Sequence, residues 1–121
     1  MSRKTIAAAS LAAALAACQP LIGDECETNI DCSEDGDRFC DRTQPNGYCT
    51  IVDCEPNSCP AEGVCVEFFE GVHARSYCMR QCDKTSDCDR DLYVCVEPDP
   101  AICTILDDPF GLKGYCAPRS E

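Results

Sequence analysis

Residues 47–49, 76–78 and 114–116 read Gly-Tyr-Cys, Ser-Tyr-Cys and Gly-Tyr-Cys, and each triplet closes a unit of four cysteines. Residues 64–67 and 94–97 repeat a second sequence, Val-Cys-Val-Glu, around the third cysteine of two units. Shared neighbours around regularly spaced cysteines indicate an internal threefold repeat. The three units are Cys26, Cys32, Cys40 and Cys49; Cys54, Cys59, Cys65 and Cys78; and Cys82, Cys88, Cys95 and Cys116.

The composition indicates that crosslinks replace a large apolar core. The chain of 121 residues contains 14 cysteines but only four Phe, four Tyr and no Trp. Chains below about 40 residues usually need disulfides or a metal to fold, and each unit is that small. We therefore predict a small disulfide-rich fold of three tandem cysteine-rich modules, 26–49, 54–78 and 82–116, each bridged internally.

Short β-hairpins are expected in the modules, because β-branched and aromatic residues flank the third and fourth cysteines. In the first module the turn signal Pro45-Asn46-Gly47 lies between these two cysteines. Little helix is expected outside the N-terminal leader. Because only residues 50–53 and 79–81 separate the modules, we expect the modules to stack closely as a short rod. Four cysteines allow three pairings, and the sequence does not choose among them.

Residues 1–17 have the pattern of an export signal. Arg3 and Lys4 precede an apolar run over residues 6–17, which is too short to span a bilayer and is typical of a cleaved signal peptide. Export places the remaining chain in an oxidising compartment, where disulfides form and persist.

The chain is strongly acidic, with a formal charge of −12. Removal of the leader with Arg3 and Lys4 leaves eight basic residues against 22 acidic ones, a charge of −14. Since no basic cluster is present to neutralise phosphates, nucleic acid is not an expected partner. The charge favours solubility, with a bound cation or a basic protein partner as the alternative.

Acidic residues crowd into the first module, which invites a calcium hypothesis. Asp31, Asp35 and Asp37 are the candidate ligands, because Ca²⁺ prefers carboxylate oxygens. The register of an EF-hand fails, since Arg42 stands where that loop needs its closing glutamate. A solvated acidic turn is the commoner origin of such a run, so calcium is an alternative interpretation.

No other site chemistry is indicated. The pairs Cys54 and Cys59 and Cys78 and Cys82 could form halves of a zinc site, but export exposes such thiols to oxidation. The chain has no Cys-x-x-Cys sequence, and His73 is its single histidine. Phosphate-binding and nucleophile motifs are also absent. We therefore predict no cofactor, no catalytic residue and no enzymatic activity.

The leader ends in Leu15-Ala16-Ala17-Cys18, which resembles the lipobox of bacterial lipoproteins. In that family the cysteine is acylated and the chain is cut just before it. The resemblance therefore implies a lipid on Cys18 and an N-terminal tether over residues 18–25. It also implies an outer-membrane location, because Gln19 replaces the aspartate often associated with inner-membrane retention.

The repeats resemble, more loosely, the small extracellular modules of the epidermal-growth-factor and Dickkopf type. This resemblance implies disulfides from the first to the third and from the second to the fourth cysteine of each module. The third module departs from the pattern through an insertion at residues 98–113, which contains a fifth cysteine, Cys103. If Cys18 carries lipid, Cys103 is the candidate for an unpaired thiol. If Cys18 carries none, the two can form a seventh bridge.

These features together predict a non-enzymatic, lipid-anchored protein of the cell envelope. Its membrane contact is the N-terminal lipid, and its loops, chiefly residues 98–113, bind an unknown protein or a glycan. A calcium-binding or purely structural envelope spacer is the alternative.

Overall fold

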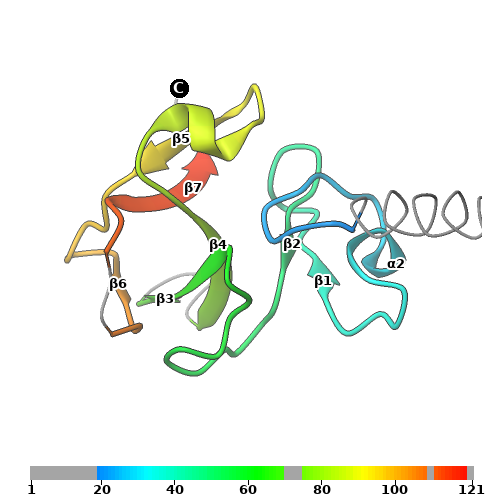
Figure 1. Ribbon diagram of the computed structural model, residues 1–121, viewed down its shortest axis with the longest axis horizontal. Coiled ribbons are helices and arrows are strands. Elements are labelled where there is room, and N and C mark those ends of the chain that lie inside the picture. Colours follow the sequence, from blue (N-terminus) through cyan, green and yellow to red (C-terminus); the bar gives the residue numbers. More distant parts are fainter. Residues whose placement is uncertain (1–18, 70–74, 109–110, 120–121) are drawn as a thin grey trace, which may run out of the picture.

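The computed structural model describes residues 19–69, 75–108 and 111–119, and it has the small disulfide-rich β fold that the cysteines predict (Figure 1). Helix is confined in these residues to two single turns, α2 (Asn29–Cys32) and the 3-10 turn η2 (Thr85–Cys88). No helix in these ranges has the length and apolar character needed to cross a bilayer. The strands are β1 (Phe39–Cys40), β2 (Cys49–Thr50), β3 (Gly63–Phe68), β4 (Ser76–Cys82), β5 (Tyr93–Val96), β6 (Cys103–Ile105) and β7 (Gly114–Pro118).

The second and third modules share one antiparallel sheet of five strands, in the order β5-β7-β4-β3-β6. The central strand β4 pairs with β3 along its first part and with β7 at Gln81 and Cys82. Figure 1 shows β4 passing between the β5 and β7 pair and the β3 and β6 pair. The sheet therefore extends across the boundary between two modules.

The linker predicted at residues 79–81 is instead part of β4. Met79 pairs with Val64 and is buried, and the N–H of Gln81 donates to the carbonyl oxygen of Glu62 at 2.9 Å. Because buried backbone groups need hydrogen-bond partners, the strand continues through the boundary where those partners are present. The expectation of a rod of stacked units is thus wrong for these two modules, which are parts of one sheet.

The first module forms its own two-stranded ladder from β1 and β2. The predicted turn lies between these strands: the N–H of Gly47 donates to the carbonyl oxygen of Gln44 at 2.9 Å. Asn46 has a φ of 59°. A type II turn requires a positive φ at its third residue and favours proline at its second, and Asn46 and Pro45 occupy these two positions. Asparagine tolerates this left-handed backbone better than most residues, so the local sequence fits the turn.

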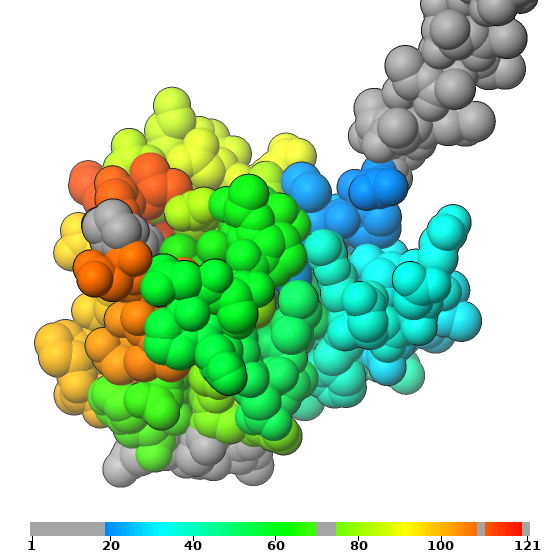
Figure 2. Space-filling view, turned by 60° about the horizontal axis from the view of Figure 1, so that its bottom comes forward, coloured from blue at the N-terminus to red at the C-terminus, as the bar shows by residue number. Residues whose placement is uncertain are grey.

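Buried polar contacts dock the first module onto the sheet. The fully buried Tyr48 hydroxyl donates to the carbonyl oxygen of Cys116 and accepts from the N–H of Arg80, both at 2.9 Å. The hydroxyl of Thr50 donates to the carbonyl oxygen of Cys78 at 2.7 Å. Figure 2 shows the first module, in blue and cyan, in direct contact with the green residues of the second. The contacts connect all three modules through one core.

Residues 19–25, predicted as a tether, belong largely to the folded body. Ile22 is 0% exposed and lies in the main core. The N–H of Gly23 donates to the carbonyl oxygen of Cys49 at 2.8 Å, and the N–H of Cys49 donates to that of Asp24 at 3.0 Å. Burial of an isoleucine side chain stabilises the fold by about 1.5–3 kcal/mol, which is sufficient reason for this segment to pack.

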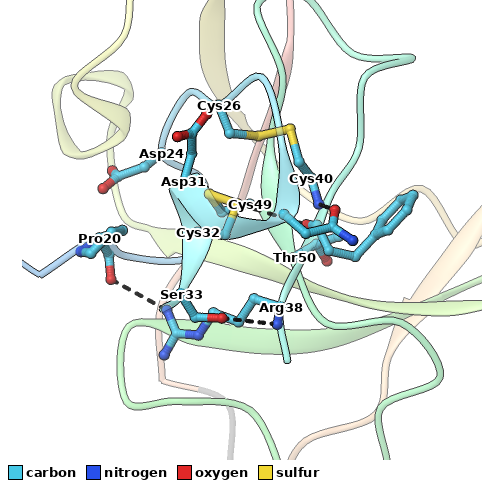
Figure 3. Close-up of a disulfide and its surroundings, with 12 residues drawn as sticks. Pro20, Asp24, Cys26, Asp31, Cys32, Ser33, Arg38, Cys40, Cys49 and Thr50 are labelled. Carbon is cyan, nitrogen blue, oxygen red and sulfur yellow. Dashed lines mark hydrogen bonds between the residues drawn. A yellow bond between two sulfur atoms is a disulfide. The ribbon is translucent and has the colours of Figure 1, made fainter. Parts of the chain in front are cut away.

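Six disulfides join the first to the third and the second to the fourth cysteine of every module, the order that the resemblance implied. In the first module, the four cysteines alone make up a buried cluster separate from the main core, with its bridges visible in Figure 3. Sulfur thus takes the place of aliphatic side chains there. The bridges are Cys26–Cys40, Cys32–Cys49, Cys54–Cys65, Cys59–Cys78, Cys82–Cys95 and Cys88–Cys116.

Candidate functional site

Several parts of the chain singled out in the sequence lie outside the described residues: the leader at residues 1–17, Cys18, His73 and residues 109–110 of the insertion. The acidic residues of the first module, the paired cysteines, Cys103 and most of the insertion can be placed.

The acidic residues of the first module serve local structure. The carboxylate of Asp31 accepts hydrogen bonds from the backbone N–H groups of Glu27 and Thr28, at 2.9 and 3.1 Å. These bonds hold the pKa of Asp31 below its usual value. Asp37 accepts a hydrogen bond from the hydroxyl of Ser33, which lies beside α2 in Figure 3. Across the described ranges no three carboxylates gather within 4.8 Å, so the calcium hypothesis gains no support.

The third module repeats this arrangement at η2. Asp87 accepts hydrogen bonds from the backbone N–H groups of Asp83 and Lys84, at 2.9 and 3.1 Å, and these bonds lower its pKa. Asp31 and Asp87 each stand one residue before the second cysteine of their module. The same aspartate therefore caps the same helical turn in two modules.

The cysteines lie close together for a structural reason. In each module the sulfur atoms of three cysteines lie within 4.8 Å of one another, a spacing that would suit a metal. All of them belong to disulfides, including Cys54, Cys59, Cys78 and Cys82 of the zinc alternative. Zinc binds thiolates rather than disulfide sulfur, so these clusters are pairs of bridges packed against each other.

The insertion at residues 98–113 is partly a strand rather than a loop. Its residues 103–105 form β6, which pairs with β3 at one edge of the sheet. The carboxylate of Asp107 accepts hydrogen bonds from the N–H groups of Asn57 and Cys65, at 2.7 and 3.1 Å. Beyond the paired register, the N–H of Phe69 donates to the carbonyl oxygen of Ile102 at 3.0 Å. These contacts hold the insertion firmly on the second module.

Cys103 forms no disulfide with another cysteine of the described ranges and is 1% exposed. Its sulfur lies 3.4 Å from the hydroxyl oxygen of Tyr115, within hydrogen-bond distance. Burial, followed by the contact with Cys103, raises the pKa of Tyr115 well above its usual range. The cysteine is therefore packed against Tyr115 of β7 and is not presented at the surface.

A groove that the sequence did not predict lies between the first module and the sheet. Its volume is about 280 Å³, and its walls combine a polar end from the first module with apolar and aromatic residues from β3, β4 and β7. We call it the Asp41 groove. Its lining residues are Asp41, Thr43, Gln44, Phe68, Tyr77, Met79, Tyr115, Ala117 and Pro118.

The polar end of the Asp41 groove contains a buried hydrogen-bond network. Asp41 is 4% exposed and accepts hydrogen bonds from the N–H of Thr43 at 3.1 Å, from the Thr43 hydroxyl at 2.5 Å and from Nε2 of Gln44 at 3.0 Å. Oε1 of Gln44 is buried and has no hydrogen-bond partner within the described chain. A buried acceptor without a partner is uncommon in folded proteins and needs a structural or functional explanation.

Aromatic rings line the opposite wall. The ring of Phe68 packs edge-on against those of Tyr77 and Tyr115, with centroids 6.2 and 6.1 Å apart. Burial raises the pKa of Tyr77, and the negative charge of Asp41 adds to that rise. The sequence carried a partial signal for this wall, because Tyr77 and Tyr115 both belong to the repeated Tyr-Cys ends. The equivalent Tyr48 is buried in the core, so the repeat alone could not identify the groove.

The fold and these sites define a small disulfide-rich β protein of the exported, extracytoplasmic type, since so many bridges form in an oxidising compartment. Comparisons of the chain with protein-family models, with curated protein sequences and with solved structures find no match.

Proposed function

We propose that this chain is a non-enzymatic, lipid-anchored binding protein of the cell envelope, held through a lipid on Cys18 in the outer membrane. The lipobox-like sequence and Gln19 support the anchor, and the six disulfides support an oxidising location. Its recognition surface is the edge of the sheet at β6 with the exposed part of residues 98–113, and its partner is another protein or a glycan.

The position of this edge is the observation that carries the proposal. The blue start of the described chain lies at the first module, while β6 and the orange insertion lie on the far side of the molecule (Figures 1 and 2). Three residues separate Cys18 from the buried Ile22, and the four Cα–Cα steps between them span at most about 14 Å. An anchor that short brings the first module close to the bilayer and leaves the insertion directed away from it.

The edge has the properties of a contact surface. Phe69 and Ile102 lie opposite each other across β3 and β6, and their side chains are 43% and 55% exposed. Cross-strand neighbours share one face of a sheet, so the two side chains form one apolar patch. Rigid scaffolds that present variable surface segments are typical of binding modules.

The anchor is tested first, by the mass of the mature N-terminal peptide and by a Cys18→Ser variant. The acylated peptide should be found in membrane extracts, and the variant should be lost from the membrane fraction. A mature N-terminus with an unmodified Cys18 would overturn the anchored form of the proposal.

The recognition surface is tested with point variants, because deletion of the insertion would also remove Cys103 and Asp107 from the fold. The variant carries Phe69→Ser and Ile102→Ser, and the control carries Leu92→Ser at another exposed apolar residue, which is 47% exposed. Crosslinking on intact cells should recover the partner with the native protein and the control but not with the double variant. Equal recovery from all three would reject β6 as the recognition surface.

A further inference from the structure

We infer that the Asp41 groove is a second binding site, which accepts a lysine or arginine side chain from a basic protein partner. This inference does not depend on the lipid anchor or on the β6 edge. It rests on three properties of the groove: the hydrogen-bonding groups at its polar end, its aromatic wall and its size.

The polar end offers acceptors. The hydroxyl of Thr43 and Nε2 of Gln44 are both directed at Asp41, so these donors are already engaged. Oε1 of Gln44 remains an acceptor without a partner, and Oδ2 of Asp41 accepts one hydrogen bond, which leaves capacity for another. A ligand that satisfies this end must therefore be a hydrogen-bond donor.

The charge of the groove selects a cationic donor. Its lining includes the carboxylate of Asp41 and no Lys, Arg or His. Each of four arginines, Arg38, Arg75, Arg80 and Arg90, is engaged elsewhere, in an ion pair or over the Tyr93 ring. A cation placed at the polar end would gain a charge-assisted hydrogen bond, which is about twice as strong as a neutral one. The net charge, −14 once Arg3 and Lys4 are removed with the leader, also attracts a basic partner over a longer range.

The remaining walls fit the stem of a long cationic side chain. Lys and Arg bury their methylene groups against apolar surface while the charged end reaches a polar group, and both are attracted to aromatic rings. Phe68, Tyr77 and Met79 supply such a surface beside Asp41. A volume of about 280 Å³ is below the range of about 300–1,000 Å³ for pockets that hold drug-sized molecules, so it favours one inserted side chain.

The test is an NMR titration of the oxidised mature protein with short capped peptides. The probes are acetyl-Gly-Lys-Gly-amide and its arginine analogue, with the norleucine analogue as a neutral control of similar shape. The cationic peptides should shift the Gln44 side-chain amide and the Tyr77 and Tyr115 ring signals. They should bind at least about tenfold more tightly than the norleucine peptide, because a hydrogen bond to a charged group usually lowers Kd by at least about that factor.

A variant and its control test the acceptor itself. Gln44→Met keeps the length of the side chain but removes both the unpartnered oxygen and the Nε2 donor to Asp41. Loss of the oxygen should weaken binding of the cationic peptides at least about tenfold. Glu67→Gln removes one negative charge from an exposed position next to Phe68 in β3, and binding should change less than twofold. The peptide series on the native protein keeps the inference testable if the Gln44 variant fails to fold.

Four results would overturn the inference. The first is equal affinity for the lysine and norleucine peptides, and the second is the absence of shifts at Gln44. The third is an affinity for spermidine, a free polyamine, that equals the affinity for the lysine peptide, because the site would then not require a protein side chain. Shifts confined to Ile102 and Phe69 would also reject the groove while leaving the β6 surface intact.

Discussion

Replacement of Tyr48 by Phe removes one oxygen atom from the junction between the first module and the sheet. That oxygen donates to the carbonyl of Cys116 and accepts from the N–H of Arg80, both at 2.9 Å, in a fully buried position. An unmade buried hydrogen bond costs about 1–3 kcal/mol, so we expect the loss of these two bonds in Tyr48→Phe to lower the free energy of unfolding by about 2–6 kcal/mol.

The assay is urea unfolding of the oxidised protein, followed by circular dichroism. Tyr93→Phe is the matched control, because the hydroxyl of Tyr93 makes one hydrogen bond across the same junction, to the carbonyl of Pro45 at 2.7 Å. Loss of this single bond should cost about 1–3 kcal/mol, about half the cost expected for Tyr48→Phe. A Tyr48→Phe variant no less stable than Tyr93→Phe would refute the reasoning, as would native protein in which the first module unfolds in a separate transition.

Three further predictions follow from single residues. The pKa values of Asp31 and Asp87 lie below the usual 3.8 in the folded protein, so the stability that these carboxylates contribute is present above pH 3.8 and is lost as the pH falls through the lowered values. A variant with both Asp31→Asn and Asp87→Asn should therefore have a lower melting temperature at neutral pH. Its melting temperature should also fall less than that of the native protein as the pH is lowered. Gly114→Ala places a methyl group on the backbone of β5 and should cost more than about 3 kcal/mol, whereas Gly111→Ala, with open space around it, should melt like the native protein. The Cys103 thiol should react with maleimide only after denaturation, and rapid labelling of the native protein would contradict its burial.

The sequence predicted those parts of the fold that depend on local chemistry. The three cysteine units, the fold class and the turn at Pro45-Asn46-Gly47 are all present in the structure. The pairing order came from a resemblance, because spacing alone permits three orders in each unit. Disulfide-rich modules of this size have few other ways to hold their loops together.

The parts that sequence reasoning missed depend on contacts between distant segments. Arg80 and Gln81 are polar and follow a cysteine, so residues 79–81 resemble a linker, yet strands β3 and β7 pair with them. Strand β6 exists only because β3 offers a free edge. The Asp41 groove joins residues 41–44 to residues 68–118, and nothing local to either segment indicates that they meet.

The acidic residues of the first module carried a sequence signal for a structural role, although their number suggested a calcium site. Counting carboxylates suggested calcium, whereas the position of Asp31 matches that of Asp87, one residue before the second cysteine. A repeated position in two modules indicates a shared structural role. In both cases the carboxylate stands at the third position of a helical turn and accepts hydrogen bonds from the backbone N–H groups at and just before the N-cap, as the reach-back residue of a capping box does.

The most direct measurement is to count thiols in the purified mature protein and to follow its unfolding with and without a reducing agent. We predict six intact bridges, a free thiol at Cys103, a single cooperative transition when oxidised and loss of folded structure on reduction. Native protein that carries mostly free thiols, or reduced protein that still melts cooperatively, would contradict the claim that crosslinked sulfur holds this fold together.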